Sequence, residues 1–171
     1  MSIIEKSKKY VQGLFEKGNT ELLTYHNWSY TKNVLEASEL IARNSKEVEE
    51  DKVEQIQLAA IFHDAGFLEG SEDHEARGAE KAISFLSDEN YGAEKIKLVE
   101  RLILATKMGH KPLDIYERVI MDADLSHLGK DNYMQTTFLN LSTEINNCSD
   151  SKMSKLQWVK NCITFCLHII T

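Results

Sequence analysis

The scarcity of chain-breaking residues is what most limits how this chain can fold. Its 171 residues include one proline, Pro112, and eight glycines. A domain rich in β-strands needs many tight turns, and proline and glycine are the residues that usually form them. Apolar residues instead recur at intervals of three and four, which places them on one face of a helix. Because the length suits one domain, the sequence predicts a single all-α domain over residues 1–171, a bundle of about eight helices.

The expected helices begin and end at local signals in the sequence. The third helix opens in the charged run 46–52, because acidic residues favour the positive end of a helix. It carries His63 and Asp64 in its last turn and stops at Gly66. Leu40 and Leu104 are expected to face the core. The eight expected helices cover residues 3–17, 28–42, 46–65, 74–86, 93–107, 115–125, 131–146 and 152–170.

The overall charge and the cysteines limit the partners and the setting. The net charge is −7 at pH 7, whereas a surface that binds duplex nucleic acid usually carries a basic excess. We therefore expect no duplex nucleic acid partner, although a small phosphorylated substrate is compatible with this charge. No stretch reaches 18 apolar residues, so no membrane span is expected. The three cysteines, Cys148, Cys162 and Cys166, form no C-x-x-C pair, which favours free thiols and a cytoplasmic setting.

A histidine and an aspartate stand side by side at the end of an apolar helix. The segment AAIFHDAG (59–66) contains His63 and Asp64 directly after four apolar residues. Burying such a pair costs several kcal/mol unless something compensates. A divalent cation compensates well, because imidazole and carboxylate are both good ligands. The alternative is a helix-terminal histidine beside a solvated aspartate, and the pair alone does not decide between the two.

Three further polar groups interrupt the apolar pattern. Asp122 and Asp124 lie in VIMDADLSHLG (119–129), His74 lies in DHEARGAEKA (73–82), and His26 lies in TYHNWSYT (24–31). Each has a purely structural explanation: the aspartates can cap a helix, His74 can begin a surface helix, and a single histidine is often structural. Only their combination with the His63–Asp64 pair indicates a site.

Taken in order, these segments resemble a known family. The motifs are YHNWSYT (25–31), FHDAG (62–66), ILATK (103–107) and DADLSHLG (122–129). They are similar to those of the HD superfamily, in particular the bacterial metal-dependent HD phosphohydrolases. The resemblance covers about residues 20–135 and leaves the C-terminal helices at 131–170 largely outside it. It implies an HD-domain-like helical bundle that hydrolyses a nucleotide or another small phosphoester with a metal-activated water.

The resemblance also implies roles for individual residues. His63, Asp64 and Asp124 would bind one divalent metal ion, which could be Mn, Fe, Zn, Ni or Mg. Asp64 would in addition act in catalysis by orienting the water, and Lys107 would stabilise the charge on the phosphate and help to bind it. His74 resembles a histidine that binds a second metal or the phosphate in some relatives, and we expect it to bind the substrate phosphate. Asp122 would cap the helix or fix the tautomer of a metal-binding histidine without touching the metal.

Two departures from the family pattern bear on activity. Tyr30 stands where the family has the second histidine of His-Asn-x-x-His, and a phenol is a poor ligand because its pKa lies near 10. His26 lies one helical turn away, about 6 Å along a helix axis, and is the candidate replacement ligand. Thr106 stands where relatives with two metals have a histidine, so one metal is expected. The rival hypothesis is a degenerate HD domain that binds a nucleotide or a protein without catalysis.

The apolar segment CITFCLHIIT (162–171) is a further expected contact. We expect it to form a helix that packs on the core, or to be an end whose natural continuation is absent, and an apolar end of this kind could also pair with a second copy. A homodimer formed through this end of the chain is therefore an expectation of the sequence.

Overall fold

The computed structural model describes residues 1–18, 20–149 and 151–170, although not the side chains of 168–170. Within these ranges the chain forms eight α-helices and no strand, which confirms the expected fold class. Three short 3₁₀ segments and one π-helical turn lie between them. The α-helices are α1 Ile3–Lys17, α2 Trp28–Asn44, α3 Val53–Phe62, α4 His74–Asp88, α5 Ala93–Ala105, α6 Ile115–Asp124, α7 Leu139–Cys148 and α8 Lys155–Ile170. The short segments are η1 Glu50–Lys52, η2 Ala65–Glu69, η3 Leu125–Gly129 and the π-helical η4 Met134–Phe138.

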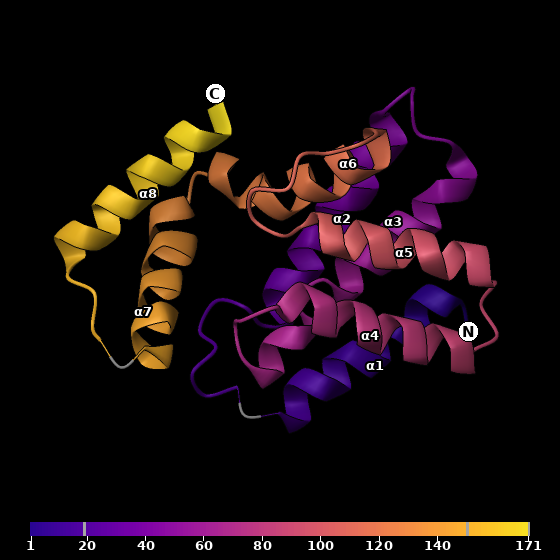
Figure 1. Cartoon of the computed structure of the whole chain (residues 1–171), viewed down its shortest axis with the longest axis horizontal. Coiled ribbons are helices and arrows are strands. Elements are labelled where there is room, and N and C mark those ends of the chain that lie inside the picture. Colours follow the sequence, from indigo (N-terminus) through magenta and orange to yellow (C-terminus); the bar gives the residue numbers. More distant parts are fainter. Residues whose placement is uncertain (19, 150, 171) are drawn as a thin grey trace.

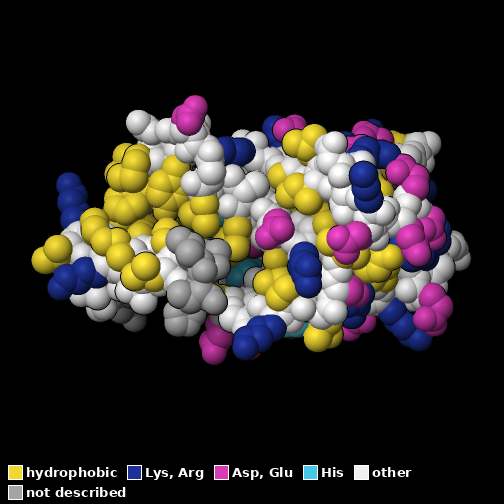
Figure 2. Space-filling model, turned by 90° about the horizontal axis from the view of Figure 1, so that it is seen from above, with side chains coloured by type: hydrophobic (Ala, Val, Ile, Leu, Met, Phe, Trp, Pro, Cys, Tyr) yellow, Lys and Arg dark blue, Asp and Glu magenta, His cyan; other side chains and the backbone are white. Residues whose placement is uncertain are grey.

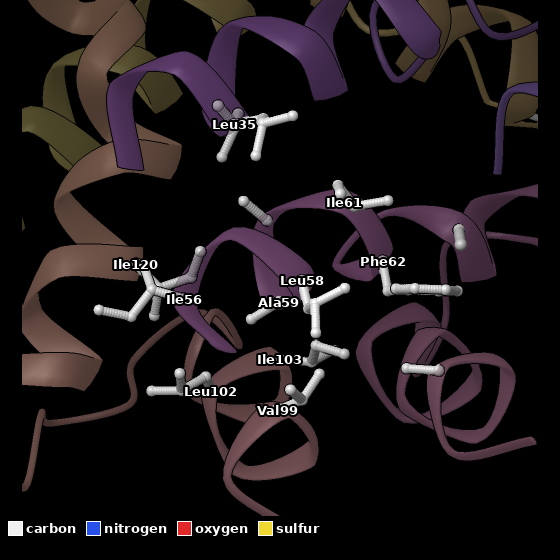
Figure 3. Close-up of a cluster of buried hydrophobic side chains, with 14 of the residues drawn as sticks. Leu35, Ile56, Leu58, Ala59, Ile61, Phe62, Val99, Leu102, Ile103 and Ile120 are labelled. Carbon is white, nitrogen blue, oxygen red and sulfur yellow. The ribbon is translucent and has the colours of Figure 1, made fainter. Parts of the chain in front are cut away.

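Helix α3 lies at the centre of the bundle because it is apolar on nearly every side. Eight of its ten residues are buried, and a helix of that kind has to be surrounded by other elements. Its side chains meet those of α2, α5 and α6 in one cluster (Figure 3). The labelled members of this cluster are Leu35, Ile56, Leu58, Ala59, Ile61, Phe62, Val99, Leu102, Ile103 and Ile120. Polar residues that directly follow α3 therefore enter the interior of the protein.

Three details of the expected fold are wrong. Leu40 is 65% exposed and Leu104 is 40% exposed. In α2 the buried positions include Ser38 and Ala42, and Leu40 lies two residues from each, on the opposite side of the helix. The charged run 46–52 does not open the third helix, since only its end forms η1 and α3 begins at Val53.

The end of α3 also differs from the expectation. The helix ends at Phe62, and His63 and Asp64 follow in a turn that leads into η2. Gly66 therefore does not stop a helix but lies inside η2.

The last two helices, α7 and α8, form a C-terminal hairpin beside the bundle (Figure 1). Trp158 of α8 is buried, and its ring lies 5.7 Å from that of Phe138. Hydrophobic side chains gather on the outside of this hairpin, at the left of Figure 2. The exposed large apolar residues there are Leu139, Leu156, Val159, Ile163 and Leu167. The homodimer expected through this end stays a prediction.

None of the helices, over the ranges just given, is long and apolar enough to cross a membrane.

Candidate functional site

The His63–Asp64 pair is fixed in place by the last turn of α3. The backbone N–H of His63 donates to the Ala59 carbonyl over 2.9 Å, and its ring Nδ1–H donates to the Ala60 carbonyl over 2.9 Å. The Nδ1 hydrogen bond sets the tautomer, so Nε2 carries the lone pair of the neutral ring and points away from the helix. Both side chains are buried, with 1% of His63 and 5% of Asp64 exposed.

Two glycines bring α4 against this turn. A β-carbon added at Gly66 would lie 2.0 Å from the carbonyl oxygen of His74, and one added at Gly78 would lie 2.6 Å from the carbonyl oxygen of Phe62. Both obstacles are backbone atoms, which cannot move aside as a flexible side chain can. The lack of a side chain at these two positions therefore allows α4 to place His74 beside Asp64.

Asp124, at the end of α6, meets this pair from the other side. His63 Nε2 lies 3.0 Å from Asp64 Oδ2 and 3.3 Å from Asp124 Oδ1. His63 Nε2 and Asp64 Oδ2 are both enclosed and have no hydrogen-bond partner in the described part of the chain. Two enclosed polar atoms this close together, each without a partner, are costly unless a charge or a proton lies between them.

The field in this pocket favours positive charge. Burial opposes a charge on His63, but the Asp64 and Asp124 carboxylates outweigh that effect, so the pKa of the imidazole lies well above its usual range. Burial likewise works against ionisation of Asp64, yet His63 and His26 beside it lower the pKa of this carboxyl to about 2. Asp64 is therefore ionised at neutral pH.

Tyr30 occupies the space next to Asp124. Its hydroxyl lies 2.7 Å from Oδ1 and 2.7 Å from the backbone oxygen of Asp124, and it has one proton to donate between them. Burial and the nearby Asp124 charge raise the pKa of this phenol well above 10. Tyr30 is thus a neutral hydrogen-bond donor that holds Asp124, and it does not offer a phenolate ligand.

Three aromatic rings form a row above Asp64. The Phe67 ring stacks on His26, with centroids 3.8 Å apart, and on its other side lies His74, with centroids 3.9 Å apart. His74 donates from Nδ1 to the Ser71 carbonyl over 3.0 Å, which leaves its Nε2 3.7 Å from Asp64 Oδ1. The row therefore brings His74 to the side of Asp64 and places His26 on the other side of Phe67.

His26 is held from a distant part of the chain. Its Nδ1 contacts Oε1 of Glu144, a residue of α7. Burial opposes a charge on His26, but Asp64 and then Glu144 outweigh it and raise the pKa of this imidazole. The sequence proposed His26 as a metal ligand; the structure places its Nδ1 on a carboxylate of the protein.

Two other expected site residues lie on the surface. The Lys107 ammonium is 2.8 Å from Asp73 Oδ1, and both side chains are more than 60% exposed. Asp73 directly precedes His74, so this pair is near the site, but no contact joins Lys107 to the His63–Asp64 pair within the described residues. Asp122 is exposed on α6, and the Ala60 carbonyl, not Asp122, fixes the tautomer of His63.

The spacing of the atoms around His63 Nε2 suits the ligands of a divalent cation. Adjacent oxygen or nitrogen ligands of an octahedral ion with 2.1 Å bonds are about 3 Å apart, which matches the separations around His63 Nε2. A neutral imidazole and two carboxylates also suit such an ion. Within residues 1–18, 20–149 and 151–170, however, no group of three or more His, Cys, Asp and Glu side chains is already arranged to hold a metal. His63 Nε2 and Asp64 Oδ2 are free to bind an ion. The third ligand atom, Asp124 Oδ1, accepts a hydrogen bond from the Tyr30 hydroxyl.

Sequence reasoning missed Glu144, Phe67 and His127. Glu144 lies in an ordinary helical segment, LNLSTEINNC, and nothing in its neighbours marks it as buried. His127 is visible in DADLSHLG but has no metal-like spacing; its Nδ1 donates to the Asp124 carbonyl over 2.9 Å. Only the folded chain brings these side chains to His26, His74 and Asp124 around the pair.

Comparison with known proteins identifies the family. The family model for the HD domain matches residues 30–128, which is more than half of the chain and contains His63, Asp64, His74 and Asp124. HD domains typically bind divalent metal ions, and the superfamily is one of metal-dependent hydrolases. No curated protein matches the sequence. No solved structure matches it either. The chain belongs to the HD domain family.

Proposed function

We propose that this protein is a metal-dependent phosphohydrolase that acts on a nucleotide or another small phosphoester. The observation that carries the proposal is the pair of enclosed, partnerless atoms, His63 Nε2 and Asp64 Oδ2, 3.0 Å apart beside Asp124. Such a pair is costly in the interior unless a positive charge lies between the two atoms, and a bound cation would supply that charge.

His63, Asp64 and Asp124 would hold the ion. When bound, it would polarise the phosphoryl group and lower the pKa of a water molecule. The protein's own residues have separate tasks. Asp64 stays ionised and keeps a hydrogen-bond acceptor beside that water, and Tyr30 fixes one oxygen of Asp124. His74 Nε2, 3.7 Å from Asp64, lies where it can bind a phosphoryl oxygen.

A polar cavity beside Tyr30 supports a nucleotide or a similar substrate. It measures about 290 Å³, and its walls include Tyr30 and His127, which both form hydrogen bonds with Asp124. Its other walls are mainly amide and hydroxyl side chains, which suit the hydrogen-bonding edges of a base or a sugar. Those side chains include Asn27, Asn33, Ser126, Asn132, Thr136 and Asn140.

A second candidate function is ligand binding without catalysis. The hydrogen bond from Tyr30 to Asp124 favours it, because a carboxylate oxygen that already accepts a hydrogen bond is a weaker metal ligand. In that case the cavity and the two imidazoles would recognise a phosphorylated ligand, and no hydrolysis would follow.

Metal content of the purified protein decides between the two, measured by elemental mass spectrometry for the wild type, Asp64→Asn and Asp122→Asn. Asp122 is the matched control because it is an exposed aspartate two residues from Asp124. We expect about one metal ion per chain in the wild type and in the control, and loss of it in Asp64→Asn. The metal-loaded wild type should then hydrolyse nucleoside monophosphates, while Asp64→Asn should not.

If the wild type holds no metal after dialysis against manganese, iron(II), zinc and magnesium, the hydrolase proposal fails. Phosphate binding by that metal-free chain would then support the non-catalytic role.

A further inference from the structure

Glu144 is a buried carboxylate that joins the C-terminal hairpin to the loop before α2. It is 4% exposed. Its Oε2 accepts from the backbone N–H of Tyr25 over 2.7 Å and from that of His26 over 2.9 Å, and its Oε1 contacts Nδ1 of His26. His26 is its ion-pair partner among the described residues. Both Glu144 and His26 lie outside the stretch that matches the HD domain, so the family match does not account for this contact.

The Glu144 contact determines the orientation of the His26 ring. A carboxylate at Nδ1 keeps that nitrogen protonated and fixes the plane of the imidazole, as it does in other carboxylate–histidine pairs. Stacking on Phe67, with ring planes 10° apart, holds the ring from one side. The other nitrogen, Nε2, has no hydrogen-bond partner in the described part of the chain, and 17% of the side chain remains exposed. His26 is thus held rigidly with one nitrogen free.

A second imidazole, His74, lies near His26, and its Nε2 faces two carboxylates, Glu75 at 3.5 Å and Asp64 at 3.7 Å. His26 and His74 lie on opposite sides of Phe67, and each is anchored through Nδ1, one by Glu144 and one by the Ser71 carbonyl. The His26 ring centroid lies 6.0 Å from that of Tyr30, whose hydroxyl donates to Asp124, so the ring lies at the edge of the site. An imidazolium donates from both nitrogens, so His26, paired through Nδ1 with the Glu144 carboxylate, can offer its Nε2–H to an oxygen of a phosphoryl group.

We propose that Glu144 positions His26 so that its Nε2 donates a hydrogen bond to a phosphoryl oxygen of the substrate, which makes α7 part of the active site. This rests on the proposed function in one respect, namely that the ligand carries a phosphoryl group. His26 touches the ligand, whereas Glu144 acts through His26 as a positioning residue. A merely structural Glu144 would hold the loop backbone and leave phosphate binding unaffected.

The test follows the histidine ring nitrogens by NMR while inorganic phosphate is added to the full chain in EDTA. The protein carries ¹⁵N-labelled histidine, and His26→Gln assigns the His26 signals. We expect phosphate to shift the Nε2 signal of His26, and His26→Gln to weaken phosphate binding about tenfold, the effect of one charge-assisted hydrogen bond. Glu144→Gln should weaken it by a smaller factor and should also remove the preference for a protonated Nδ1.

Glu117→Gln and His110→Gln are the matched controls. Glu117 is 1% exposed, accepts from the Leu113 backbone N–H over 2.8 Å and contacts His110 Nε2 over 2.8 Å, so it repeats the Glu144 arrangement away from the pair. Both controls should keep the wild-type phosphate affinity. A wild-type His26 signal that does not respond to phosphate overturns the proposal even if a variant fails to fold. Wild-type phosphate affinity in folded His26→Gln overturns it as well.

The outcome is separate from that of the metal measurement. A His26 response in a chain that retains no metal keeps this inference and removes the hydrolase. Retained metal without a His26 response keeps the hydrolase and removes this inference.

Discussion

Single residues decide whether this HD domain can hold a metal ion. The resemblance to the HD superfamily implied that His63, Asp64 and Asp124 belong together, and the structure places Asp64 Oδ2 and Asp124 Oδ1 3.0 and 3.3 Å from His63 Nε2. Their role as ligands stays a prediction. Sequence also marked Tyr30 as a departure, but only the structure shows what it does, because its hydrogen bond to Asp124 joins residues 94 positions apart.

Tyr30→Phe tests that hydrogen bond. The phenylalanine ring can keep the packing against Tyr25 and His63, while Asp124 loses its donor. We expect the free energy of unfolding to fall by about 1–2 kcal/mol without metal, the cost of leaving a partly buried acceptor without a partner. A divalent ion can take the place of that donor, so manganese should raise the melting temperature more in Tyr30→Phe than in the wild type. Differential scanning fluorimetry with and without manganese measures both; an equal shift in the two proteins would contradict the role given to Tyr30.

At the scale of helices, the sequence predicted best where one face is apolar. The first helix was placed at its observed bounds, because α1 alternates a buried and a solvated face over its whole length. Helix α3 has no such alternation, and its acidic approach, 46–52, is exposed whatever structure it forms. Its start could therefore not be read from periodicity. The close crossing of α3 and α4 was also not predictable, since a glycine in a sequence does not reveal which backbone approaches it.

That crossing makes a prediction about three glycines. Gly66→Ala and Gly78→Ala place a methyl group on backbone oxygens, and we expect each to lower the free energy of unfolding by about 3 kcal/mol or more. Gly13→Ala is the control, because no atom lies within 4 Å of its added β-carbon in the middle of α1. That change should stabilise the protein by about 0.5–1 kcal/mol. Urea unfolding gives all three values, and a Gly66→Ala protein as stable as the wild type would refute the close crossing.

Over the whole molecule, buried carboxylates link stability to pH. Burial opposes the ionisation of Glu117, but the hydrogen bonds from His110, the Leu113 amide and Arg101 outweigh it and lower the pKa of this carboxyl. The same balance holds for Glu144, whose partners are His26 and two backbone amides. A carboxyl with a lowered pKa in the folded state stabilises the fold above its unfolded pKa, near 4.3. That stabilisation is lost as the pH falls through the lower folded value.

We therefore expect the free energy of unfolding to decrease steadily as the pH is lowered from about 5 to below 4. Glu117→Gln removes one of the responsible groups, so its stability should be lower at pH 7 and should depend less on pH in this range. Urea unfolding at pH 7, 5, 4 and 3.5 measures the slope. Equal slopes for the two proteins would show that Glu117 does not contribute to this dependence.

The contact between Glu144 and His26 has a consequence for the order in which the protein assembles. It joins residues 118 positions apart. The Thr24 hydroxyl donates a hydrogen bond to the Asn140 carbonyl across a similar span, so the two flanks of the HD region meet each other. Closing so long a loop costs entropy until the intervening helices have already drawn its ends together. The bundle should thus fold first, and the C-terminal hairpin should dock on it last. By the same reasoning the hairpin is the first part to undock, and each undocking would release His26 while the rest of the molecule stays folded.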